Sequence, residues 1–127
     1  MEEEYKKVTA DCLRNYNSGQ FEKAEASYTE LLENNKEGDN DKVLALIYNN
    51  RGHARYMQVE FYTAKDDYDV AIKLDPELGS AYYNRATILY RMGKYSEALT
   101  DFQKSIKIDP NNVEFQEGLV NCQKCTV

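Results

Sequence analysis

The chain carries the stretch YNNRGHARYMQVEFYTAKDDYDVAIKLDP at residues 48–76, and YYNRATILYRMGKYSEALTDFQKSIKIDP follows at residues 82–110. The two stretches align without a gap at an offset of 34 residues. Chance would supply about two identities over such a length, so the ten that occur indicate duplication of a supersecondary unit. The identical pairs are Tyr48/Tyr82, Asn50/Asn84, Arg51/Arg85, Tyr56/Tyr90, Ala64/Ala98, Asp67/Asp101, Ile72/Ile106, Lys73/Lys107, Asp75/Asp109 and Pro76/Pro110.

A weaker third copy lies upstream of these two. The pattern G-x-F-x-x-A-x-x-x-Y at residues 19–28 matches the pattern at residues 93–102. Between the first and second copies, the segment ENNKEGDNDK at residues 33–42 has no apolar residue, so we expect a polar loop there. The predicted organisation is a single domain over residues 1–127, with repeats at about 5–38, 45–78 and 79–112.

Each copy is expected to form two helices joined by a turn. Apolar residues recur at three- and four-residue spacing, which is typical of one face of a helix. The Asp-Pro pairs at 75–76 and 109–110 should end the second helices, because proline disfavours helical geometry in the residue before it. No run alternates at period two, so we predict an all-α fold with turns at 17–20, 58–60 and 92–94.

Small and large residues alternate in a way that specifies helix packing. Small side chains recur where helices must approach closely, and aromatic ones recur between them. The small positions are Gly52, Ala64, Ala71, Ala86, Ala98 and Ser105, and the aromatic ones are Tyr48, Phe61, Tyr68, Tyr82, Tyr95 and Phe102.

The order of these residues resembles the tetratricopeptide repeat family over nearly the whole chain. In the second and third copies an aromatic residue is followed by Gly or Ala, then by A-x-x-x-F or a close variant, and then by Pro. The resemblance implies a right-handed α-solenoid of three helix-turn-helix repeats closed by a C-terminal capping helix. Residues 113–124 are expected to form that helix, with Val113, Phe115, Leu119, Val120 and Cys122 as its inner residues.

Composition argues against several partners and compartments. The net charge of −6 disfavours nucleic acid, whose binding needs clustered Lys and Arg. The longest apolar run, residues 43–48, is far shorter than the roughly 20 residues that span a bilayer, so no membrane association is expected. The first residues, MEEEYKK, lack the features of a secretory signal, and the three cysteines, Cys12, Cys122 and Cys125, form no disulfide framework. These features predict a cytoplasmic protein.

No chemistry of catalysis is apparent in the sequence. The only histidine is His53, and no P-loop, HExxH or GxSxG motif is present, so we expect neither an enzyme nor a cofactor. Cys122 and Cys125 stand alone without the further ligands that a structural zinc needs. The carboxylates of residues 66, 67 and 69 diverge on a helix, so no metal site is expected there.

The resemblance implies a concave side lined by the first helix of each repeat. Residues that helical spacing assigns to it are rich in Asn and Tyr, which suit contact with an extended peptide because aromatics supply apolar area and amides pair with a backbone. We therefore predict a protein-binding adaptor, or scaffold, whose groove residues are Asn49, Asn50, His53, Tyr56, Tyr83, Asn84, Thr87, Tyr90 and Arg91.

Alternatives stay open at this point. The Asn50 and Asn84 amides could instead be satisfied within the protein. The chain could also be a self-associating or obligate subunit that uses its helix faces. The oligomeric state is not determined by the sequence, although a monomer is favoured. The partner's identity and any redox role of Cys122 and Cys125 are likewise left open.

The family also includes Hsp70/Hsp90 co-chaperones that clamp an acidic C-terminus with two lysines, an arginine and two asparagines. Carried over by repeat position, that clamp falls on five residues of which only Asn50 has the matching type. Without the cations, a terminal carboxylate would lack its charge-assisted partners. The clamp function is therefore disfavoured. The five positions are Thr9, Leu13, Asn50, Ser80 and Asn84.

One pair of charges recurs with the repeat period. Arg51 and Arg85 stand where the family usually has Leu, and Asp67 and Asp101 recur on the second helices. A charge packed against helices should have a partner. We expect each arginine to lay its stem on apolar surface and to bond one of the aspartates, in a structural role.

Overall fold

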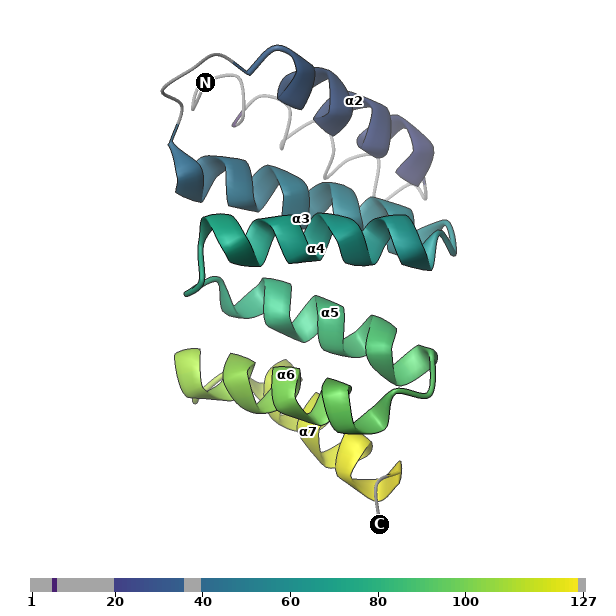
Figure 1. The fold of residues 1–127 in the computed structure, drawn as a ribbon, viewed down its shortest axis with the longest axis vertical. Helices are drawn as coiled ribbons and strands as arrows, with labels where there is room; N and C mark the ends of the chain where they lie inside the picture. The colour runs from purple at the N-terminus through teal and green to yellow at the C-terminus, as the bar shows by residue number, and fades with distance from the viewer. Residues whose placement is uncertain (1–5, 7–19, 36–39, 126–127) are drawn as a thin grey trace. The chain divides into compact units, whose positions relative to one another are not determined.

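A computed structural model of the chain describes Lys6, residues 20–35 and residues 40–125, and within these ranges it contains helices and no strand. The all-α prediction is confirmed there. Cys12, the clamp positions Thr9 and Leu13, and most of the first expected turn lie outside the described residues. The helices, labelled as in Figure 1, are α2 (Phe21–Glu33), α3 (Asp41–Met57), α4 (Phe61–Leu74), α5 (Gly79–Arg91), α6 (Tyr95–Ile108) and α7 (Val113–Cys125).

The helices fall into two compact units, divided between Asp75 and Pro76. In the first unit α3 packs against both α2 and α4, and in the second α6 packs against both α5 and α7. Figure 1 shows α3 beside α4 and α5 beside α6. The connections at 58–60 and 92–94 have three residues each, which is short enough to make successive helices antiparallel neighbours. The single-domain organisation stays a prediction.

The helix ends follow the expected stop signals. α4 and α6 end immediately before the Asp-Pro pairs, and Asp75 has an extended backbone with φ −140° and ψ 90°. The start of α3 differs from the prediction. This helix begins at Asp41, inside the segment at residues 33–42 that the sequence predicts to be a polar loop. The Asn40 side chain accepts a hydrogen bond of 2.8 Å from the Lys42 backbone N–H, and this N-cap starts the helix early.

The core of the first unit lies between α2 and α3, and α4 covers the other side of α3. Val43, Ile47 and Ala54 join apolar residues of α2 in one cluster. On the opposite face of α3, a Cβ at Gly52 would lie 2.6 Å from the Tyr68 ring of α4. Only glycine therefore lets α3 and α4 approach this closely, as the pattern of small residues predicted.

The core of the second unit joins α5, α6 and α7 around Phe102 and Leu89. Phe115 and Cys122 of α7 are buried as predicted, but Val113 and Val120 are not, with 63% and 49% of their surfaces exposed. The prediction was wrong for these two residues. Phe115 and Cys122 are seven residues apart and share one helix face, whereas Val113 and Val120 share a face turned about 160° away.

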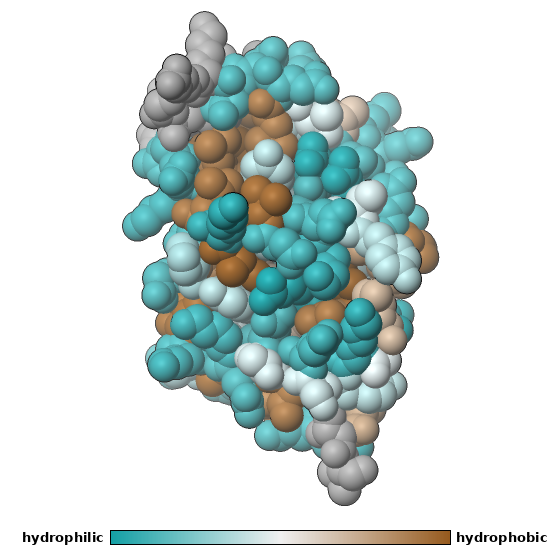
Figure 2. All heavy atoms as spheres, viewed as in Figure 1, coloured by the Kyte–Doolittle hydropathy of each residue, from teal (hydrophilic) through white to brown (hydrophobic). Residues whose placement is uncertain are grey.

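Exposed apolar residues interrupt a mostly polar surface. Figure 2 shows hydrophilic side chains over much of the viewed face, with hydrophobic residues in patches between them. The most exposed large apolar side chains of the described ranges are Tyr62 (76%), Val59 (71%) and Val113 (63%). Two of these three, Val59 and Tyr62, lie at one end of the α3–α4 hairpin.

Candidate functional site

The recurring charge pair forms an ion network in the first unit. Arg51 donates from Nε (2.9 Å) and Nη2 (2.7 Å) to the two carboxylate oxygens of Asp67. Arg55 donates to the same carboxylate at 3.0 Å and to Glu25 of α2 at 3.0 Å. Burial alone would lower the pKa of Arg51, but the hydrogen bond and charge of Asp67, together with the charges of Tyr48 and Glu25, raise that pKa above its ordinary value.

The second unit has an equivalent Arg–Asp pair. Arg85 donates from Nε (2.7 Å) and Nη2 (2.9 Å) to Asp101. Each arginine also lies over the ring of the tyrosine three residues before it, Arg51 at 5.4 Å from Tyr48 and Arg85 at 5.8 Å from Tyr82. Each guanidinium group is thus held between a carboxylate and an aromatic ring.

A pocket of about 280 Å³ lies in the second unit, among α5, α6 and α7. Tyr83, Thr87 and Tyr90 are spaced at four and three residues, so they share one face of α5 and form one wall. Phe102 of α6 makes an edge-on contact with the Tyr83 ring at 5.7 Å. We call this the α5–α7 pocket, and its lining is Tyr83, Thr87, Tyr90, Arg91, Phe102, Gly118 and Asn121.

Two lining residues of α7 were missed in the sequence analysis. A Cβ at Gly118 would lie 2.6 Å from the Phe102 ring and 3.1 Å from the Tyr83 ring, so glycine allows α7 to close the pocket. Asn121, one turn later, is exposed at the mouth. Helical spacing places Asn121 on the face of Gly118, but α7 was assigned only a capping role, so neither residue was considered.

A hydrogen bond joins α5 to the end of α7 beside this pocket. The Tyr90 hydroxyl and the Cys125 thiol lie 3.1 Å apart, and this bond raises the pKa of the Tyr90 phenol. Cys122, which is buried, donates from its thiol to the Tyr95 carbonyl oxygen at 3.4 Å, and burial raises the pKa of that thiol. The two cysteines therefore differ: the Cys125 thiol is exposed and the Cys122 thiol is shielded.

The structure distributes the predicted groove residues unevenly. Tyr83, Thr87, Tyr90 and Arg91 line the α5–α7 pocket, whereas Asn84 is half-buried and outside its lining. Asn49 is only 5% exposed, so the expectation that it lies on an open surface is wrong. Asn49 lies three residues before Gly52 and shares its face, which packs against α4.

The remaining groove residues lie along α3 in the first unit. Asn50, His53 and Tyr56 are half-buried. The His53 and Tyr56 rings stack at 6.4 Å, and the Tyr56 ring contacts Phe61 at 5.4 Å. His53 is thus part of an aromatic row rather than an isolated titratable group.

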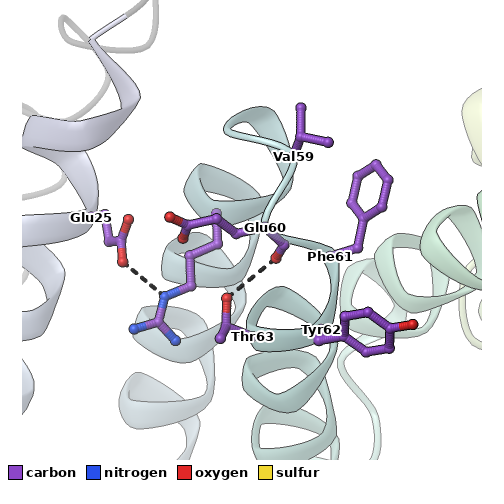
Figure 3. Close-up of a pocket in the computed structure, with 7 residues that line it drawn as sticks. Glu25, Val59, Glu60, Phe61, Tyr62 and Thr63 are labelled. Atoms are coloured by element: carbon purple, nitrogen blue, oxygen red, sulfur yellow. Dashed lines mark hydrogen bonds and ion pairs between the residues drawn. The ribbon is translucent and has the colours of Figure 1, made fainter.

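A second pocket, of about 390 Å³, lies in the first unit at the turn between α3 and α4, and no sequence signal had indicated it. Figure 3 shows Val59 at the tip of the turn, with Phe61 and Tyr62 extending from the start of α4 on the side opposite Glu25. Val59 has φ 65°, the left-handed region that is unfavourable for a β-branched residue. We call this the turn pocket; its lining is Glu25, Arg55, Val59, Glu60, Phe61, Tyr62 and Thr63.

Neither metal nor membrane chemistry is indicated in the described part of the chain. No cluster of three or more His, Cys, Asp or Glu side chains among those residues could hold a metal ion. None of the helices described is both long and apolar enough to cross a bilayer.

Comparison with known proteins accounts for this architecture. Residues 79–112 match the tetratricopeptide repeat family. Those residues are a tetratricopeptide repeat, and the chain has the fold of that family. The match covers the third copy, whose helices α5 and α6 form the Tyr83, Thr87 and Tyr90 wall and the Phe102 contact of the α5–α7 pocket.

Solved tetratricopeptide domains resemble nearly the whole chain. The first such domain of Spaghetti (RPAP3), bound to the HSP90 peptide SRMEEVD, is 20% identical with a TM-score of 0.86, covering 98% of this chain and 96% of that one. The OM64 domain of Arabidopsis is 25% identical with a TM-score of 0.84, covering 96% of each. The second domain of human RPAP3, in complex with the HSP70 peptide SGPTIEEVD, is 24% identical with a TM-score of 0.80, covering 96% and 97%.

Proposed function

We propose that the chain is a non-catalytic protein-interaction module that holds an extended segment of a partner protein against α5 and α7. The observation that carries the proposal is the α5–α7 pocket, because four residues assigned to a ligand groove from sequence spacing line it together. The tetratricopeptide fold supports the same function, since similar domains are solved with bound peptides.

The size and lining of the pocket suit one side chain of a peptide. Pockets for drug-sized ligands usually measure about 300–1,000 Å³, and a pocket of 280 Å³ lies just below that range. The rings of Tyr83, Tyr90 and Phe102 supply apolar contact with little conformational entropy to lose. The Asn121 amide at the mouth has a donor and an acceptor for the peptide backbone on either side.

Absence of catalysis is part of the proposal. Acyl, phosphoryl and glycosyl transfer all need a nucleophile with a base, a metal or an acid–base pair in one pocket. The lining of the α5–α7 pocket offers tyrosines, an arginine, a threonine and an asparagine, and the Thr87 hydroxyl is already committed to the Tyr83 carbonyl oxygen at 3.0 Å. A cytoplasmic location also stays a prediction, which fractionation of cells would test.

A substitution that fills the pocket mouth tests the site. Asn121→Trp places an indole over the opening without disturbing the core, because Asn121 is exposed. Val120→Trp, on the neighbouring exposed position outside the pocket lining, is the matched control. Affinity capture from lysate with quantitative mass spectrometry should lose at least nine-tenths of a specific partner with Asn121→Trp and retain it with Val120→Trp. Equal capture by both variants would refute the site.

The same proposal predicts poor binding of acidic chaperone tails. The similar domains hold HSP90 and HSP70 peptides. Here Ser80 and Asn84 stand where the clamp resemblance would require a lysine and an arginine. We expect calorimetric titration with SRMEEVD to give no affinity better than about 100 μM, and Ser80→Lys with Asn84→Arg to increase it. Micromolar binding by the unchanged chain would contradict this expectation.

A second candidate function is supported by the outer face of α7. Val113 and Val120 are exposed there, and they would suit a contact with another subunit or another copy of the chain. Sedimentation velocity at rising protein concentration distinguishes the two functions. A mass that rises with concentration for the chain, but not for Val113→Ser with Val120→Ser, would favour self-association.

A further inference from the structure

The turn between α3 and α4 has two of the same backbone hydrogen bonds as the equivalent turn between α5 and α6, but it differs in several side chains that contact solvent. Gly93 has φ 78°, and no atom lies within 4 Å of the position that a Cβ would occupy. A left-handed backbone at a turn is a usual role for glycine. Val59 occupies the equivalent position with φ 65°, although a β-branched residue is strained there. Folding alone would favour glycine at residue 59.

The residues around Val59 differ in the same direction. Exposed apolar or acidic residues in the first turn stand where the second turn has basic or small polar ones. Met57 and Tyr62 are 45% and 76% exposed, and their equivalents are Arg91 and Ser96. Glu60 is likewise replaced by Lys94. We call the set Met57, Val59, Glu60, Phe61 and Tyr62 the turn surface.

The charges in the turn pocket are unbalanced. Among the described residues that line the pocket, Arg55 is the one cation, and it is already bonded to Glu25 and Asp67 at 3.0 Å each. The Glu60 carboxylate has no hydrogen bond or ion pair within the described part of the chain. Figure 3 shows the Glu60 side chain directed toward the side on which Glu25 lies. The pocket therefore combines an excess of negative charge with the exposed apolar surface of Val59.

We propose that the turn surface is a second docking site, which takes a partner segment with a Lys or Arg side chain next to an aromatic or large aliphatic one. The cation is paired with Glu60 beside Glu25, and its aliphatic stem lies on Val59 in the turn pocket. The neighbouring apolar side chain packs against Phe61 and Tyr62. Strain kept at an exposed residue, together with unpaired charge and exposed aromatic area, is typical of a recognition surface.

This site is separate from the α5–α7 pocket and does not depend on the proposed function. The probes are three fluorescein-labelled nonapeptides of Gly and Ser with a central Phe-Arg, Phe-Gln or Phe-Glu pair. Two-dimensional NMR titration should show the Phe-Arg peptide shifting the amides of residues 57–63. Its affinity should exceed that of the Phe-Glu peptide by about tenfold.

Variants taken from the equivalent turn test the residues. Glu60→Lys should reduce the affinity for the Phe-Arg peptide about tenfold and reverse the charge preference, while the matched control Lys94→Glu should leave both unchanged. Val59→Gly should weaken binding severalfold and at the same time raise the melting temperature. A variant that lost binding by unfolding could not show those two changes together.

Three experimental outcomes would overturn the proposal. Equal affinity for the three peptides, or no chemical-shift change at the amides of residues 57–63, would show that the turn surface does not bind a basic segment. Concentration-dependent dimerisation that Val59→Gly with Tyr62→Ser abolishes would assign the surface to a second copy of the chain instead. Asn121→Trp should leave the Phe-Arg affinity unchanged, so failure of the α5–α7 pocket and failure of this site are distinguishable.

Discussion

The copies at residues 45–78 and 79–112 share a backbone plan and differ in how they stabilise it. Arg55 and Leu89 occupy equivalent positions, but Arg55 connects Glu25 to Asp67, whereas Leu89 is 4% exposed within an apolar cluster. The arginine is tolerated because α2 places a carboxylate opposite it. One backbone position can therefore accept an ion network or a buried aliphatic side chain, depending on the neighbouring helix.

The two aspartates at the centre of these networks should differ most. Asp67→Ala removes the partner of both Arg51 and Arg55 and should lower the free energy of unfolding by about 3 kcal/mol. Asp101→Ala affects Arg85 alone, whose side chain is 24% exposed, and should cost about 2 kcal/mol. Urea unfolding followed by circular dichroism measures both. A larger loss for Asp101→Ala would show that the second bond to Arg55 contributes nothing.

The closest helix contact should give the next largest difference. Gly52→Ala places a methyl group 2.6 Å from the Tyr68 ring, and because that ring is buried the variant should lose about 1–2 kcal/mol despite the better helix propensity of Ala. The reciprocal Ala86→Gly should lose about 1 kcal/mol through helix propensity, and it should lose more because the Ala86 methyl group is buried in the core. Melting temperatures would check this, and stabilisation by Gly52→Ala would mean that the α3–α4 hairpin opens without cost.

The turns should give the smallest effects, of opposite sign. Val59→Gly relieves a strained backbone and should raise the free energy of unfolding by about 0.5–1 kcal/mol, whereas Gly93→Val introduces the strain and should lower it by about 1 kcal/mol. Differential scanning calorimetry of the two variants beside the unchanged chain is sufficient. Destabilisation by Val59→Gly would mean that the valine side chain has a structural role in the turn.

Much of the fold could be predicted because it depends on local rules. The positions of the turns at 58–60 and 92–94 and the ends of α4 and α6 follow from helical periodicity and from proline, which act within a few residues of chain. Four lining residues of the α5–α7 pocket were found by the same periodicity, since Tyr83, Thr87 and Tyr90 share a face whatever packs against it. Asn49 was misplaced because its environment depends on α4.

The features of α7 that the sequence analysis did not predict depend on contacts between helices. Gly118 and Asn121 belong to a pocket only because α7 closes against Phe102, and the face that α7 presents is decided by which of its apolar residues fits α6. Val113 and Val120 are as apolar as the residues that were chosen, so composition could not separate them.

The sequence by itself determined the repeat, the ends of α4 and α6 and the recurring Arg–Asp pairs, because each recurs at a fixed period and follows from local geometry. Only the tertiary structure decided that Arg55 joins Glu25 to Asp67, that Val59 takes a left-handed backbone, and that α7 completes a pocket. These features depend on which side chains from distant segments meet. The sequence carries no periodic signal for these contacts, because each of them occurs only once in the chain.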